Sequence, residues 1–415
     1  MTVALFVVVA VVVVALIFDF TNGFHDSANA MAGPIATGAL KPRTAVLLAA
    51  VLNIVGAFLS TEVAKTISGG FFDERLVTPT IVLAGLTGAI LWNLITWLFG
   101  LPSSSSHALF GGLIGAVAVG TGLGSVNFSV IISKVLLPAV AAPLVAGVAA
   151  ATAIQIADRV VTDVSKKDAK KGFRRAQAFT ASMTALAHGT SDGQKTMGVI
   201  TLVLITAGLQ EPGTDPHWWV VALAGLAIGL GTYSGGWRIM RTMGKGIVKI
   251  DAKQGAAAGA ATTATILASA HVGFGLSTTH VSTGSILGSG VGRKGADVRW
   301  GVARRMMYGW LLTLPAAAII GGAASVLAAH DFAGTIVLLV LLGIACLVIW
   351  LLSRRNQVDR TNVTDSADVL VLNAAKPNKI AKAQRKEAAR RAKEEQRSGL
   401  STDGSSQPEP QRRGD

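Results

Sequence analysis

The stretch that decides the fold is Gly23-Phe24-His25-Asp26-Ser27-Ala28-Asn29-Ala30-Met31, because a second copy of its pattern stands later in the chain. The copy is Gly189-Thr190-Ser191-Asp192-Gly193-Gln194-Lys195-Thr196-Met197, and it repeats the glycine, the aspartate and the methionine at the same spacing. Recurrence of a motif is the sequence signature of an internal repeat. The chain is therefore expected to consist of two related halves.

A second pair of motifs supports the same division. Ser104-Ser105-Ser106-His107 and Ser277-Thr278-Thr279-His280 are each followed by two glycines spaced about one helical turn apart. Both motif pairs occur in the same order along the chain. The two halves are therefore expected to share one arrangement of helices.

Composition places the chain in a bilayer. Of its 415 residues, 51% are hydrophobic and 14% charged, whereas soluble proteins carry about 25% charged residues. The long apolar runs cover residues 3–18, 46–59, 81–99, 218–230 and 335–352. With their flanks, these runs approach the ~17–25 residues that span a membrane. The first run lacks a basic start and a small-residue cleavage site, so we expect a membrane span there and not a signal peptide. These features predict an all-α polytopic membrane protein in contact with lipid.

Charge predicts the orientation. The net charge of +14 comes from Lys and Arg in connecting segments and in the tail, which is typical of cytoplasmic loops and does not require a nucleic-acid partner. If the basic clusters are cytoplasmic, the N-terminus lies outside the cytoplasmic membrane and the C-terminus inside, with about eleven passages. An odd number of passages falls in the first half, so the second half enters from the opposite side. The repeats are therefore expected to be inverted.

We expect about 10–12 membrane segments in total. The stretches at 103–123 and 276–292 are short and rich in Gly and Ser, which favours broken helices or re-entrant hairpins. The predicted organisation is a first repeat at 1–157, a basic cytoplasmic linker at 158–177, a second repeat with a final span at 178–353, and a basic, largely disordered cytoplasmic tail at 354–415. Inverted repeats with interrupted segments are typical of secondary transporters, whose substrates bind near the midplane.

The acidic motifs predict a site for a cation. Asp26 and Asp192 stand in apolar surroundings, where a carboxylate costs at least ~2.5–3.5 kcal/mol unless it is paired, solvated or bound to a cation. Small and amide residues after each acid are expected to let the helix unwind and expose carbonyl oxygens beside Asn22 and Asn29. In the plainer interpretation, the acids pair with Lys195 or another basic residue and hold the bundle together.

The hydroxyl motifs predict a site for an anion. Each motif precedes a helix, whose first N–H groups and positive dipole end favour a negative charge. Two such helix starts facing each other could hold one tetrahedral oxyanion. Serines are also common N-caps, and only the repetition of the motif favours substrate binding. His25, His107, His188 and His280 stand in or beside the motifs, and with an ordinary pKa near ~6.5 they are candidates for a proton relay or for simple helix contacts.

Enzymatic activity is not expected. The sequence contains no P-loop, no zinc-protease motif and no nucleophile elbow. An intramembrane phosphatase would need a phosphate-clamping arginine, and the motifs contain none. The single cysteine, Cys346, excludes a disulfide framework and a cysteine metal site. We expect no resident cofactor and no metal centre.

At these motifs the sequence resembles the inorganic phosphate transporter (Pit) family over roughly residues 10–325. The matching stretches are Asn22-Gly23-Phe24-His25-Asp26-Ser27-Ala28-Asn29-Ala30, Trp92-Asn93, Leu101-Pro102-Ser103-Ser104-Ser105-Ser106-His107, His188-Gly189-Thr190-Ser191-Asp192-Gly193-Gln194-Lys195 and Ser277-Thr278-Thr279-His280-Val281. The resemblance implies a low-affinity symporter that imports inorganic phosphate with H⁺ or Na⁺, either as the free anion or with Mg²⁺ or another divalent cation. A sulfate or other oxyanion permease of the same fold is the alternative, and a homodimer is left open.

The resemblance also implies which residues form the site. Phosphate would be bound by Ser104, Ser105, Ser106, Ser277, Thr278, Thr279, Asn29 and Gln194. The coupling ion would be bound by Asn22, Asp26, Asp192 and Ser191. The family usually has Asn before each motif aspartate, and this chain has His25 and Ser191 there. The serine is a shorter ligand, so the identity of the coupling ion stays open.

Overall fold

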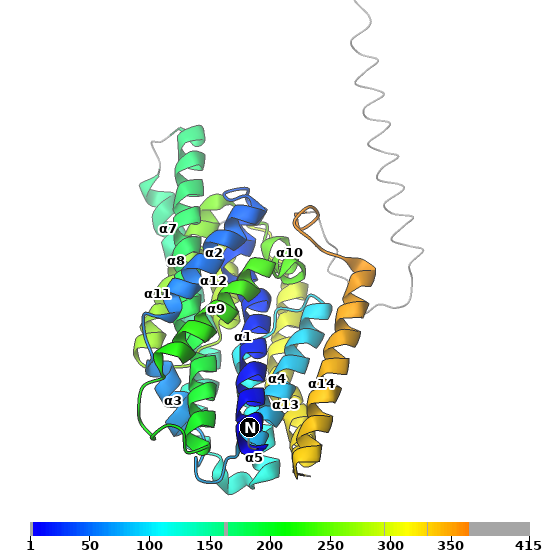
Figure 1. Cartoon of the computed structure of the whole chain (residues 1–415). Helices are drawn as coiled ribbons and strands as arrows, with labels where there is room; N and C mark the ends of the chain where they lie inside the picture. The colour runs from blue at the N-terminus through cyan, green and yellow to red at the C-terminus, as the bar shows by residue number, and fades with distance from the viewer. Residues whose placement is uncertain (1–2, 162–164, 294, 330, 365–415) are drawn as a thin grey trace, which may run out of the picture. The chain divides into compact units, whose positions relative to one another are not determined.

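Helices account for nearly all of the chain whose structure is described. The computed structural model describes residues 3–161, 165–293, 295–329 and 331–364. Within these residues no strand forms, and two isolated bridges join Phe72 to Val126 and Val248 to Val298. The predicted all-α class is confirmed (Figure 1). The predicted tail is described only up to residue 364, and the rest of it lies outside the described residues.

The same succession of helices occurs twice. The first half contains α1 (Val3–Ala36), α2 (Pro42–Ala57), α3 (Glu62–Gly70), α4 (Pro79–Leu98), α5 (Ser105–Gly120), α6 (Phe128–Ile131) and α7 (Leu137–Val160), with short turns η1 (Leu123–Ser125) and η2 (Ile132–Leu136). The second half contains α8 (Lys166–Thr206), α9 (Trp218–Ser234), α10 (Trp237–Lys245), α11 (Ala252–His271), α12 (Thr278–Val291), α13 (Trp300–Ala328), α14 (Asp331–Ser353) and η3 (Arg354–Asn356). The bends between α2 and α3 (64°) and between α9 and α10 (68°) fall at equivalent places. The two halves are therefore structural repeats.

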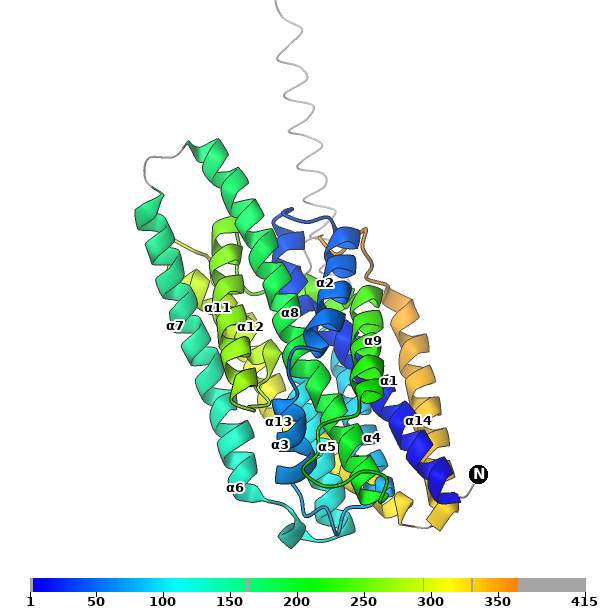
Figure 2. The ribbon, with the colours of Figure 1, turned by 60° about the vertical axis from the view of Figure 1, so that its left-hand side comes forward.

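Each half completes the packing of the other. Helix α13 packs against α4 and α5 of the first half, whereas α7 packs against α11 and α12 of the second (Figure 2). Helices α1 and α2 pack against α8 and α9. The final helix, α14, lies beside α4 and α13.

Polar contacts identify the two ends of the bundle. At one end Lys253 pairs with Asp158, and Arg293 pairs with Asp251. These contacts join segments that the charge pattern assigns to the cytoplasm. At the other end Thr61 donates to Asp215 at 2.9 Å, and Phe72 bridges to Val126. Helix α12 leads toward Arg293, whereas α5 leads toward Val126, so the equivalent half-helices run to opposite ends. The predicted inversion is present in the structure.

The predicted unwinding at the acidic motifs is wrong. Helix α1 runs unbroken through Asp26, and α8 runs unbroken through Asp192. An unwound turn would expose backbone groups that must be satisfied in apolar surroundings, whereas a continuous helix satisfies them internally. The breaks occur elsewhere, before α5 and α12 and within the bent pairs. Gly235, with φ +79°, takes a left-handed conformation at the α9–α10 break.

Length and composition identify five candidate membrane spans, or up to seven when each bent pair counts as one. The predicted total of about eleven passages is reached only when α5, α8, α11 and α12 are also counted. Helix α5 is short, and α8 is polar in composition. Hydropathy alone therefore does not identify them as spans. The interval predicted as a linker, 158–177, is mostly helical, because α7 extends to Val160 and α8 begins at Lys166.

Glycines allow α2 and α8 to approach closely. A Cβ atom at Gly189 would lie 2.2 Å from the carbonyl oxygen of Asn53, and one at Gly56 would lie 2.2 Å from that of Leu186. Contacts this short leave no room for any side chain. The glycine that begins the second acidic motif is therefore required by packing.

A matched pair of substitutions on α8 tests this requirement. Gly189→Ala should destabilise the protein by about 1–3 kcal/mol through overpacking. Gly172→Ala is the control, because nothing lies within 4 Å of the Cβ position there, and it should gain about 0.5–1 kcal/mol from helix propensity. The midpoint of thermal unfolding in detergent measures both. Equal midpoints for the two variants would contradict the packing argument.

Candidate functional site

The two hydroxyl motifs form the starts of α5 and α12. Ser104 is the N-cap of α5, and its hydroxyl accepts the backbone N–H of His107 at 3.1 Å. Ser277 caps α12 in the same way and accepts the N–H of His280 at 3.2 Å. The first N–H groups of each helix have no acceptor within the helix, so both starts present positive partial charge. The plain capping interpretation therefore applies to Ser104 and Ser277.

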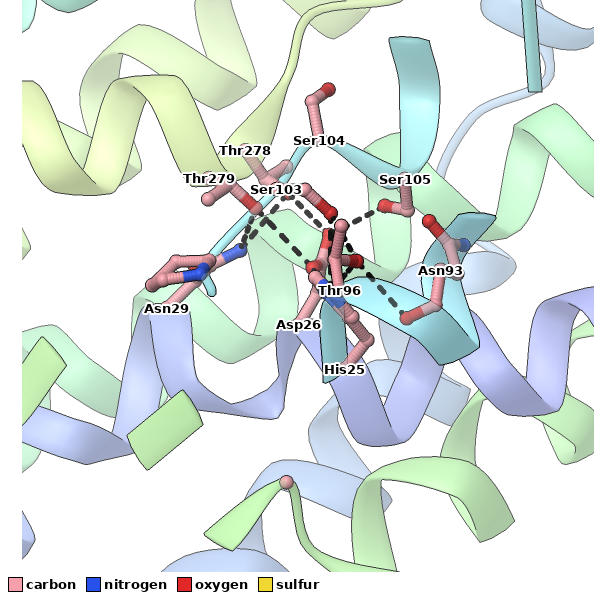
Figure 3. Close-up of polar contacts among 12 residues, drawn as sticks. His25, Asp26, Asn29, Asn93, Thr96, Ser103, Ser104, Ser105, Thr278 and Thr279 are labelled. Carbon is pink, nitrogen blue, oxygen red and sulfur yellow. Dashed lines mark hydrogen bonds and ion pairs between the residues drawn. The ribbon is translucent and has the colours of Figure 1, made fainter. Parts of the chain in front are cut away.

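Asp26 joins the two helix starts. Its Oδ2 accepts a hydrogen bond from Ser105 of α5 at 2.7 Å and lies 3.3 Å from the Thr278 hydroxyl of α12. Its Oδ1 accepts from Thr279 at 3.2 Å and lies 2.7 Å from Nδ1 of His25. Figure 3 shows these hydroxyls pointing toward the carboxylate. One side chain of α1 thus connects both repeats.

Asn29 holds the second helix start to α1. Its Nδ2 donates to Thr278 at 3.3 Å and to Thr279 at 3.1 Å. Its backbone carbonyl accepts from Ser282 at 2.8 Å. The structure therefore brings Asn29 into the predicted site.

Lys195 is the central cation of the site, and the sequence prediction of site residues omitted it. Its side chain is 1% exposed. Its Nζ lies 2.6 Å from Asp192 Oδ1, 2.6 Å from Ser106 Oγ and 2.9 Å from the carbonyl oxygen of Leu276. The signal was present in the repeat, since Lys195 occupies the position that Asn29 occupies in the first motif.

The plainer interpretation of the acids holds in part. Asp192 forms an ion pair with Lys195, as that interpretation expects. Asp26 forms no such pair among the described residues, and its contacts are hydroxyls and a histidine. Only the second acid is therefore neutralised by a lysine.

Asp26, His188 and Asp192 could share a cation. One ligand atom from each lies within 4.8 Å of the others, and all three side chains are buried. Nε2 of His188 lies 3.3 Å from Asp192, and Nδ1 contacts Asn53 at 3.0 Å. Carboxylate oxygens with one imidazole suit a range of divalent cations.

His25 connects Asp26 to a small hydroxyl chain. Its Nε2 lies 3.3 Å from Ser103 Oγ and 3.4 Å from Thr96 Oγ1, and these two hydroxyls are 2.7 Å apart. A histidine between a carboxylate and hydroxyls can pass a proton. Thr96 was missed because it lies in α4, outside every motif.

The rings of His107 and His280 contact each other and make no contact with a carboxylate among the described residues. Their rings are 4.7 Å apart, and His280 also contacts Trp310 at 4.0 Å between ring centroids. They line an apolar cavity of about 790 Å³ between α7, α12 and α13. In the described part of the chain, no hydrogen bond or ring contact joins these two predicted relay residues to His25 or His188.

Three other predicted residues also stand apart. Gln194 turns toward the start of α3, where its Oε1 accepts the N–H of Val63 at 2.7 Å. The side-chain oxygen of Ser191 and the amide of Asn22 are buried and have no hydrogen-bond partner among the described residues. None of the three has a recorded contact with Asp26, Asp192 or the hydroxyl motifs.

The electrostatics of the cluster suit an anion only when a cation is also present. Lys195 and two helix starts attract negative charge, whereas Asp26 and Asp192 repel it. Since all of these groups are buried, their charges are weakly screened. An oxyanion that enters this site therefore needs positive charge beside the carboxylates.

Comparison with known proteins gives consistent relatives. The model of the "Phosphate transporter family" matches residues 22–321. A "Probable low-affinity inorganic phosphate transporter" of Mycobacterium tuberculosis H37Rv is 52% identical over 366 residues, covering 88% of both chains. A protein of the same description from Bacillus subtilis is 42% identical over 326 residues, covering 78% of this chain and 98% of its own.

A solved structure shares the fold. It is described as "The sodium-dependent phosphate transporter", has a TM-score of 0.64 and 24% identity, and covers 77% of this chain and 98% of its own. At this identity the likeness speaks for the fold alone. The family match spans most of the chain and both motif pairs, and the relatives are transporters and not enzymes. This chain is therefore a membrane protein that belongs to the phosphate transporter family.

Proposed function

We propose that this chain is a secondary active symporter that imports inorganic phosphate across the cytoplasmic membrane together with H⁺ or Na⁺. In this proposal the N-terminus lies outside and the C-terminus inside. The ion pairs of Lys253 with Asp158 and of Arg293 with Asp251 support this orientation, because they join basic connecting segments with one another. The relatives described as low-affinity inorganic phosphate transporters support the substrate.

The hydrogen bonds of Asp26 carry the proposal. The hydroxyls of Ser105 and Thr279 donate to this carboxylate. The hydroxyl of Thr278 lies between this carboxylate (3.3 Å) and that of Asp192 (3.2 Å). A phosphate oxygen would accept from these same donors. The carboxylate thus stands in for the oxyanion. Phosphate takes these donors over when a cation neutralises the acid, which makes anion binding depend on cation binding.

Lys195 supplies the fixed positive charge of the phosphate site. Its Nζ already contacts the hydroxyl of Ser106 at the start of α5, so an oxyanion at this helix start meets both groups. One lysine among neutral donors holds phosphate less firmly than an arginine clamp would. Such a site suits release on the far side of the membrane.

Asp26, His188 and Asp192 are the groups for a cation that travels in contact with phosphate. Their ligand atoms are close enough to share one ion. Mg²⁺ or another divalent cation bound to phosphate would offset the two carboxylates and enter as part of the cargo. A bound proton or Na⁺ would offset them less completely.

Uptake into proteoliposomes tests the function. Purified protein should accumulate radiolabelled phosphate under an imposed proton gradient or sodium gradient, and excess sulfate should not compete. The same vesicles with Mg²⁺ added show whether a metal complex is carried. Accumulation of sulfate with no phosphate uptake would keep the fold and overturn the substrate.

The helix starts can be tested apart from their capping. Ser105→Ala with Ser106→Ala should raise the KM for phosphate at least about tenfold, since two donors to an anion are lost. The cap variant Ser104→Ala is the control and should lower stability by about 1 kcal/mol while the KM changes far less. Measured initial rates and unfolding midpoints separate the two effects. An unchanged KM for the double variant would contradict the cradle.

Lys195→Met should abolish saturable phosphate uptake. The change removes the cation of the site and leaves Asp192 buried without its lysine, so the anion meets uncompensated repulsion. Because the loss of a buried ion pair also destabilises proteins, the pair of changes Lys195→Met and Asp192→Asn is measured alongside. Insertion and stability should recover in the double variant, and phosphate uptake should not. Recovered uptake would show that Lys195 serves packing alone.

A further inference from the structure

Asp19 is a buried carboxyl group that the phosphate site does not use. It lies in α1, seven residues before Asp26 and therefore about two turns away on the same face. The side chain is 0% exposed, and neither oxygen has a hydrogen-bond donor among the described residues. Few groups cost as much free energy in a membrane protein as a carboxylate in this position.

Other oxygen ligands surround Asp19. Asn22 follows Asp19 by three residues on α1 and so lies on the same helix face. Thr196 comes from α8, which packs against α1. Both polar groups act on the Asp19 carboxyl but make no direct hydrogen bond with it. Both are buried, and both lack a hydrogen-bond partner in the described part of the chain. A carboxyl, a carboxamide and a hydroxyl oxygen, all buried and unsatisfied, form the hard oxygen set that binds a small cation. Unpaired polar atoms are rare in protein interiors, so three together require a reason.

The acids of the phosphate site differ from Asp19 in this respect. Asp26 accepts from hydroxyls and contacts His25, and Asp192 is paired with Lys195. Asp19 alone among these three has neither a hydrogen bond nor an ion pair with a described residue. The buried carboxyl groups of Asp19, Asp26 and Asp192 lie in this region with one buried ammonium group, which contacts Asp192. An entering phosphate adds further negative charge. The missing positive charge is therefore greatest at Asp19.

We propose that Asp19, Asn22 and Thr196 form a second cation site, which binds the monovalent cation that drives transport, H⁺ or Na⁺. The inference rests on the proposed symport and places the driving ion apart from the cation that contacts phosphate. Asn22, which was predicted to bind the coupling ion together with Asp26, would here bind it together with Asp19. The inference also adds Asp19 and Thr196, which the motif comparison did not select.

The position explains how the driving ion affects phosphate. The ligands come from α1 and α8, the same two helices that carry Asp26, Asp192 and Lys195. Because α1 packs against α8 in a weakly screened interior, the charges of Lys195 and Asp192 act on Asp19. While Asp19 is negative it attracts the Lys195 ammonium; once a cation is bound there, the full charge of Lys195 acts on the anion. Cation and anion therefore favour each other's binding.

Comparison of two modes of transport tests the site. Asp19→Asn carries no charge and mimics the cation-loaded carboxylate, so the loaded carrier forms without an ion. The variant should lower gradient-driven phosphate uptake at least about tenfold more than it lowers phosphate–phosphate exchange. Asp215→Asn, which neutralises an exposed aspartate at one end of the bundle, is the matched control and should lower neither selectively. If Asp19→Asn does not insert, Thr196→Val tests the same site more mildly.

Stability measurements identify the ion and do not depend on transport. If Na⁺ binds, NaCl should raise the unfolding midpoint of the wild type relative to choline chloride, and Asp19→Asn should lose that rise. If H⁺ binds, sodium should have no effect, and the rise in midpoint at lower pH should be smaller in Asp19→Asn. Asp192 and Lys195 are the charged groups that face Asp19, and both are unchanged in the comparison.

The outcomes separate this inference from the proposed function. Gradient-driven uptake by Asp19→Asn at the wild-type rate would overturn the second cation site, and so would an equal loss of uptake and exchange. Neither result would affect phosphate symport by the wild type. If the wild type itself moves no phosphate, the proposed function fails. The stability measurement then still tests the cation site. The site would be overturned if the unfolding midpoint of Asp19→Asn responded to Na⁺ and pH like that of the wild type.

Discussion

The carboxylate of Asp26 is the contact on which the arrangement of the two repeats depends. It accepts hydrogen bonds from the starts of α5 and α12, which come from opposite halves and run to opposite ends of the bundle. Two positive helix ends would otherwise face each other in a weakly screened interior. The negative charge of Asp26 therefore stabilises the close approach of the two helix starts. Under the proposed function, an oxyanion replaces the carboxylate, because both offer the same acceptor chemistry. The donors that hold the two halves together would then also recognise the anion.

Much of this could be predicted from the sequence, because the repeats record it. The membrane class and the inverted halves follow from motif order and charge. The resemblance to the family implied site roles for Asp26, Asn29, Ser105, Thr278 and Thr279, which the structure brings into contact. Lys195 could have been found from its alignment with Asn29. Asp19 and Thr196 could not have been found by comparing the repeats, since a carboxyl group draws notice only when its surroundings show that it is unpaired.

The errors have a common cause. Gly, Asn and Ser near an acid were interpreted as signs of an unwound helix, yet α1 and α8 are continuous there. Gly189 allows α2 to pack closely against α8 and does not make the helix flexible. His107 and His280 follow the hydroxyl motifs in sequence, but side chains on a helix point in different directions from one residue to the next. Their ring contacts with each other and with Trp310 fit the alternative of simple helix contacts.

The exchange of α7 and α13 between the halves has a consequence for biosynthesis. Helices α4 and α5 pack against α13, which emerges from the ribosome only after α8 to α12 of the second half. The first half cannot reach its final packing while it is the only part inserted. Helix α5 lacks its contact with α13 during the synthesis of about half the protein. A chain cut in the α7–α8 connection would form two fragments that need each other to fold. Assembly of this protein is thus completed late, when α13 enters the membrane and covers the first half-helix.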